Sequence, residues 1–80
     1  MYRNKKYCFL DVTKSMCRKV APIICAGDKI LITFTSKDVP QYGDYVLISD
    51  NEYQWIEKYR EGLRERFNNI YPIRRVIMNS

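Results

Sequence analysis

The sequence of 80 residues contains no histidine, and its three cysteines form no Cys-x-x-Cys pair. Without histidine, Ser–His and Cys–His catalysis are excluded within this chain. A structural zinc site is disfavoured for the same reason. The odd set of Cys8, Cys17 and Cys25 is typical of reduced thiols in a cytoplasmic protein. We therefore expect no metal and no cofactor.

The sequence also lacks an apolar run near the ~20 residues that a membrane span needs. A basic tail, residues 1–6, comes first, but Asp11 and Lys14 interrupt the apolar stretch behind it, unlike in a signal peptide. We expect a cytoplasmic protein without membrane contact. At this length we also expect one domain, 1–80, without a DNA-binding domain. Its small core favours a dimer or a larger partner.

Positive charge is concentrated before residue 40, and the formal net charge is +5. Such a basic half could bind nucleic acid or an acidic protein, although a merely soluble surface is the more ordinary explanation. No RRM, KH, zinc-finger or helix-turn-helix pattern supports the stronger interpretation. The candidate nucleic-acid contacts are Lys5, Lys6, Arg18 and Lys19.

Short apolar segments separated by turn residues predict a mostly β fold, a small twisted antiparallel scaffold. The segments rich in aromatic and β-branched residues predict strands at residues 7–12, 29–35, 45–49 and 73–78. Residues 13–21 are polar and end at Pro22, so they predict a loop or a short helical turn. We expect loops at residues 36–42 and 68–72, and a core within residues 23–56.

Two of these strands follow the same phrase, Gly27-Asp28 and Gly43-Asp44. Glycine can adopt a positive φ that other residues avoid, and aspartate can close the turn with its side-chain oxygen. The doubled phrase therefore predicts two strand starts in one scaffold.

Residues 52–67 fit two conformations. As a helix they align Trp55, Tyr59, Leu63 and Phe67 at a spacing of four, which the local pattern slightly favours. Against the helix, Gly62 would cost ~1 kcal/mol in its interior. As strands they would form a hairpin at residues 50–51 and a second one into residues 63–67.

The order of these segments resembles the LexA/UmuD-like S24 peptidase fold, as in the C-terminal domains of phage-type repressors. The matching segments are VTKSM (12–16), GDKILI (27–32), PQYGDYVLI (40–48), QWIEKY (54–59), NNIYP (68–72) and RVI (75–77). The resemblance favours strands over residues 52–67.

The resemblance implies a Ser–Lys dyad, in which a neutral lysine accepts the proton of a serine nucleophile. Ser15, followed by methionine, fits the nucleophile position. A rival alignment on Pro22 places Lys19 there and leaves no nucleophile. The lysine position falls on Glu57, and Lys58 is one residue along, which on a strand is the opposite face.

Because the sequence resembles this fold but does not supply a complete Ser–Lys dyad, we interpret it as a non-catalytic protein-interaction module. We expect it to dimerise or to bind a repressor or other regulatory protein of transcription, as a phage or mobile-element protein would. The candidate anchors are Tyr53, Trp55 and Tyr59, unless these aromatic side chains are core. One alternative is a hydrolase using Ser15 with Lys58 or Lys19, and another is a small basic nucleic-acid-binding protein.

Overall fold

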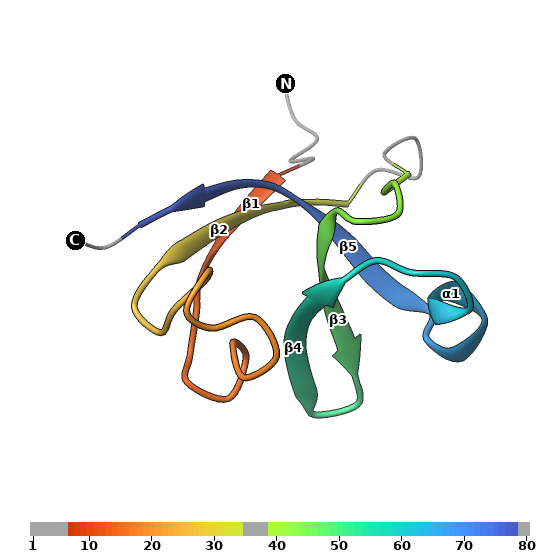
Figure 1. Cartoon of the computed structure of the whole chain (residues 1–80), viewed down its shortest axis with the longest axis horizontal. Coiled ribbons are helices and arrows are strands. Elements are labelled where there is room, and N and C mark those ends of the chain that lie inside the picture. The colour runs from red at the N-terminus through yellow and green to blue at the C-terminus, as the bar shows by residue number, and fades with distance from the viewer. Residues whose placement is uncertain (1–6, 35–38, 79–80) are drawn as a thin grey trace, which may run out of the picture.

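The computed structural model describes residues 7–34 and 39–78 (Figure 1). In these two ranges, five strands form one antiparallel sheet in the order β1-β2-β5-β3-β4. The strands are β1 (Tyr7–Asp11), β2 (Lys29–Thr33), β3 (Tyr45–Asp50), β4 (Tyr53–Lys58) and β5 (Asn69–Ile77). The expectation of a mostly β fold is confirmed. Residues 36–38 of the predicted loop at 36–42, and the basic tail with Lys5 and Lys6, lie outside the described residues.

β5 holds the two parts of the sheet together. Its first residues pair with β3, from Ser49↔Asn69 to Val46↔Pro72, and its last residues pair with β2. The predicted loop at 68–72 was wrong, because the strand begins at Asn69. Pro72 is tolerated because its missing N–H falls where the strand changes partner, one residue before Ile73 meets β2.

The two Gly-Asp phrases form the same turn. Gly27 and Gly43 have φ of 95° and 96°. In each turn the aspartate Oδ2 accepts the N–H three residues earlier at 2.9 Å, from Cys25 to Asp28 and from Gln41 to Asp44. β2 and β3 each begin directly after the turn.

Residues 52–67 contain a strand and a single helical turn. The long helix considered for this range was wrong, because Tyr53–Lys58 is β4 and pairs with β3 along its whole length. The strand predicted at 63–67 was also wrong, because α1 (Leu63–Arg66) is helical there. Gly62, with φ of 88°, permits the change of direction. No helix in the described ranges is long and apolar enough to cross a membrane.

Apolar side chains cover both faces of the sheet. On one face the loop of residues 12–28 packs against β2, β3 and β4 and forms the first core with them. This core contains Val12, Met16, Cys17, Val20, Ile24, Ile30, Ile32, Leu47 and Ile56. On the other face Leu63 of α1 packs with Val46 and Ile48 in a second core, joined by Trp55, Tyr59, Phe67 and Ile70. The helical spacing of Trp55, Tyr59, Leu63 and Phe67 thus identified a real cluster, although a strand and a turn build it.

Candidate functional site

The loop of residues 12–28 lies beside β4, the last strand of the sheet (Figure 1). The backbone N–H of Ile56 donates to the carbonyl of Met16 at 2.8 Å, which joins the loop to the outer edge of β4. Met16, Cys17 and Val20 are buried in the first core. Their neighbours Ser15, Arg18 and Lys19 are exposed, so the loop presents these polar side chains beside β4.

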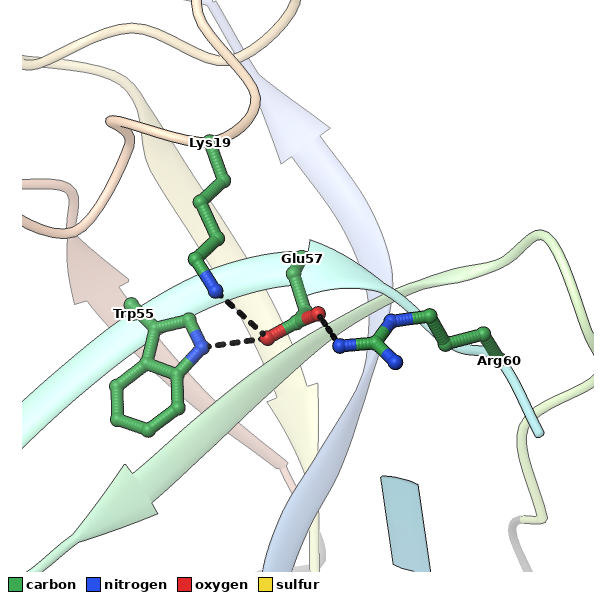
Figure 2. Close-up of polar contacts among 4 residues, drawn as sticks. All are labelled: Lys19, Trp55, Glu57 and Arg60. Atoms are coloured by element: carbon green, nitrogen blue, oxygen red, sulfur yellow. Dashed lines mark hydrogen bonds and ion pairs between the residues drawn. The ribbon is translucent and has the colours of Figure 1, made fainter. Parts of the chain in front are cut away.

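The carboxylate of Glu57 is the centre of a polar cluster (Figure 2). Only 7% of this residue is exposed. Its Oε1 accepts hydrogen bonds from Nε1 of Trp55 at 2.7 Å and from Nζ of Lys19 at 3.4 Å. Its Oε2 accepts one from Nη2 of Arg60 at 3.2 Å. Because Trp55 and Glu57 are two residues apart on a strand, their side chains lie on the same face.

This environment fixes the charge of the carboxylate. Burial by itself raises the pKa of Glu57, but the Trp55 hydrogen bond, the Lys19 charge and the bonds from Lys19 and Arg60 outweigh it. The pKa of Glu57 therefore lies below its ordinary value of 4.5. A carboxylate held in its ionised form by three donors is a poor proton acceptor near neutral pH.

Ser15 and Lys58 line different hollows. The hydroxyl of Ser15 lies 3.3 Å from Oγ1 of Thr13. With Arg18 and β4 side chains it lines a hollow of about 430 Å³, here called the Ser15 hollow; its lining residues are Ser15, Arg18, Glu52, Tyr53, Gln54 and Trp55. Nζ of Lys58 lies 5.9 Å from the ring centre of Tyr45, in a separate hollow of about 300 Å³.

The ion pair occupies both dyad positions of the rival alignment. Lys19 stands where that alignment expects the serine, and Glu57 where the lysine is expected, and their charged groups are 3.4 Å apart. A proton relay of the Ser–Lys type needs a hydroxyl nucleophile and a neutral amine. At these two positions the structure has an ammonium and a carboxylate, which is the arrangement of a structural ion pair.

The three candidate aromatic anchors do not share one surface. Tyr53 is 72% exposed and lines the Ser15 hollow together with the half-buried Trp55. The Trp55 ring meets Phe67 edge-on, with centres 5.2 Å apart, so one side of it belongs to the second core. Tyr59 is half-buried and stacks on Tyr42 with ring centres 5.6 Å apart, beside a different hollow.

The candidate nucleic-acid contacts are also divided. Arg18 is exposed and lines the Ser15 hollow, whereas Lys19 is engaged with Glu57. Sequence reasoning missed the roles of Arg60 and of the Trp55 indole in this cluster. The spacing of Trp55 and Glu57 by two residues would have placed them on one face once that segment was taken as a strand.

Within residues 7–34 and 39–78, no group of three or more His, Cys, Asp or Glu side chains could hold a metal ion. Cys8, Cys17 and Cys25 are free thiols. No protein-family model, curated protein or solved structure matches the chain.

Proposed function

We propose that this protein is a non-catalytic relative of the LexA/UmuD-like fold that binds a repressor or another regulatory protein. The observation that carries the proposal is the Lys19–Glu57 ion pair. In the alignment on Pro22 it occupies the positions where the resemblance implies a nucleophile and a base, and it offers neither. The two Gly-Asp turns and the paired strands around it are the scaffold features that support the resemblance.

The Ser15 hollow is the proposed docking site for that partner. Tyr53 projects into solvent at its rim, Trp55 forms part of its wall, and Arg18 supplies a positive charge. Tyrosine, tryptophan and arginine are the residue types that most often dominate protein–protein binding. Lys19 and Arg60 hold the Glu57 carboxylate, which accepts the hydrogen bond from Nε1 of Trp55. The Trp55 side of the hollow is therefore preorganised, which lowers the entropic cost of binding.

A photo-crosslinking amino acid at position 53 tests this docking site. We expect it to give a discrete adduct with one regulatory protein in the native host, and Arg18→Glu in the same chain should abolish that adduct. The matched control carries the crosslinker at Arg64, an exposed residue of α1. The proposal is overturned if positions 53 and 64 give the same adducts, or if Arg18→Glu leaves the adduct unchanged.

The absence of catalysis has its own test. A serine-reactive fluorophosphonate should label the wild type no more than Ser15→Ala. Labelling that depends on Ser15 would contradict the proposal and establish a nucleophile, because such probes react with activated hydroxyls.

A further inference from the structure

The two edges of the sheet differ in whether another segment of the chain covers them. At the β4 edge, the loop of residues 12–28 covers the strand, and the N–H of Ile56 is satisfied by Met16. β1 forms the opposite edge and pairs with β2 on one side. In the described part of the chain, no segment pairs with its other side. An uncovered edge strand is a template for pairing with another chain.

The backbone groups that face this open edge can be assigned. The N–H of Val12 donates to the carbonyl of Asp28 at 2.8 Å, so the backbone groups of Val12 face β2. Because the direction alternates along an antiparallel strand, Cys8 and Leu10 also bond towards β2. The N–H and C=O groups of Tyr7, Phe9 and Asp11 therefore point outward. The Phe9 carbonyl accepts a 3.5 Å contact from the thiol of Cys8, a weak donor.

The side chains of β1 suit an interface. Tyr7 and Phe9 are 53% and 54% exposed, which is unusual for aromatic rings on a sheet. Cys8 and Leu10, on the other face, pack partly against the first core. The strand contains no lysine and no proline, the residues that commonly protect an edge from pairing.

We infer that β1 pairs with β1 of a second copy of this chain, antiparallel and related by a two-fold axis at Phe9. In this register Phe9 lies opposite Phe9 of the second copy, Cys8 opposite Leu10, and Tyr7 opposite Asp11. Aromatic pairs and apolar pairs directly opposite each other stabilise a sheet. The Tyr7 hydroxyl can donate to the Asp11 carboxylate, and no like charges face each other.

The length of β1 selects this register from the other symmetric ones, because only an axis at Phe9 pairs its five residues with one another. An axis at Asp11 would set two carboxylates directly opposite each other, which is destabilising. An axis at Tyr7 would set Phe9 and Asp11 opposite residues 5 and 3, which lie outside β1. With the axis at Phe9 all five residues of β1 are paired, and the first cores of the two copies become continuous through Cys8 and Leu10. This self-complementarity is why a second copy fits the edge.

The pairing leaves the Ser15 hollow free, because that hollow lies at the β4 edge of the sheet. A dimer would therefore carry two such hollows. The inference goes beyond the function proposed above and uses different residues, so either can fail without the other.

Disulfide trapping at position 9 tests the register. In a Cys8→Ala, Cys25→Ala background, Phe9→Cys should form a disulfide-linked dimer under mild oxidation. The Cα atoms of a hydrogen-bonded antiparallel pair lie about 5.5 Å apart, within disulfide range, so we expect cross-linking roughly tenfold faster than for Lys29→Cys. Lys29→Cys is the control, because Lys29 is also exposed but lies on β2, one strand inward from the open edge. Equal rates for the two variants would overturn the inference.

Phe9→Pro tests the same edge without a thiol. It removes an N–H that faces outward, so the bonds between β1 and β2 are retained. We expect a folded monomer by circular dichroism and sedimentation, where the wild type sediments as a dimer, and Phe9→Ala should give a weakened dimer. A monomeric wild type at high micromolar concentration would overturn the inference. If Phe9→Pro does not fold, the cross-linking rates decide alone. The crosslinker at position 53 can also be placed in Phe9→Pro. If its adduct with the partner protein persists in that monomeric variant, the docking proposal holds independently of the dimer.

Discussion

Nζ of Lys19 lies 3.4 Å from Oε1 of Glu57, although the two residues are 38 positions apart in the sequence. The contact joins the loop of residues 12–28 to β4, together with the backbone bond between Ile56 and Met16. Its two ends differ in environment, because 58% of the lysine side chain is exposed and only 9% of the glutamate side chain. The buried carboxylate therefore depends on its donors more than the ammonium depends on it.

Glu57→Gln should lower the free energy of unfolding by about 1 to 2 kcal/mol, because the negative charge is lost and one of the two acceptor oxygens becomes an amide NH2 that cannot accept a hydrogen bond. Lys19→Met should cost less, about 0.5 kcal/mol, since its ammonium is largely solvated. Urea unfolding of both single variants and the double variant gives the coupling energy. Lys58→Met, the exposed neighbour on the other face, is the control and should be neutral. A coupling of zero would show that the ion pair does not join the loop to the sheet.

The pKa of Glu57 predicts a pH dependence with a definite sign. Since the pKa of Glu57 in the folded protein lies below its ordinary value of 4.5, the unfolded chain binds the proton more readily. The stability contribution is complete above that ordinary value and is lost as the pH falls through the folded pKa. The difference in unfolding free energy between wild type and Glu57→Gln should therefore shrink from pH 7 to pH 3. A difference that stays constant or widens over this range would contradict the assignment.

Thr33→Val should stabilise the protein. Thr33 is 1% exposed, and its Oγ1 has no hydrogen-bond partner within the described residues. Replacing an unsatisfied buried hydroxyl by a methyl group of similar shape removes a desolvation penalty of about 1 kcal/mol or more. Thr33→Ser keeps the hydroxyl and loses the methyl group, so it should destabilise instead. Thermal melts that rank the valine variant below the wild type would mean that the hydroxyl has a partner.

Gly43→Ala should destabilise the protein through the backbone alone. Gly43 has φ of 96°, and a Cβ there would meet nothing within 4 Å. The cost of placing an L-residue in this conformation is about 1 to 2 kcal/mol. Gly43→Asn should cost less, because asparagine tolerates positive φ. If alanine and asparagine shift the melting temperature equally, the strain is not the cause.

The sheet was largely predictable because its strands have strong local signals. The β-branched runs and the two Gly-Asp turns placed the starts of β2 and β3 correctly. The helix considered for residues 52–67 was wrong because apolar residues at a spacing of four indicate only which side chains cluster. A strand followed by α1 produces the same cluster. β5 was predicted too short since Asn69 and Pro72 read locally as a loop, while pairing with β3 overrides that preference.

The site was less predictable than the fold. Both alignments of the dyad were open from the sequence, and only the contact across 38 positions shows that Lys19 meets Glu57. Arg60 was beyond reach because no local signal reports which donors surround a carboxylate, whereas the two-residue spacing of Trp55 and Glu57 on a strand could have placed those two side chains on one face. Ser15 lies beside β4 in the Ser15 hollow, and its contact with the hydroxyl of Thr13 was not anticipated.

The position of β5 has a consequence for how the chain acquires its structure during synthesis. β3 and β4 are joined by a tight turn and can pair as soon as both have left the ribosome. β2 and β3, however, have no pairing with each other, and residues 69–77 must be inserted between them. The two parts of the sheet therefore keep unpaired edges until residues 69–77 have been translated. Folding is then dominated by contacts between distant segments, so we expect it to be slow for a chain of this size and to be sensitive to chaperones.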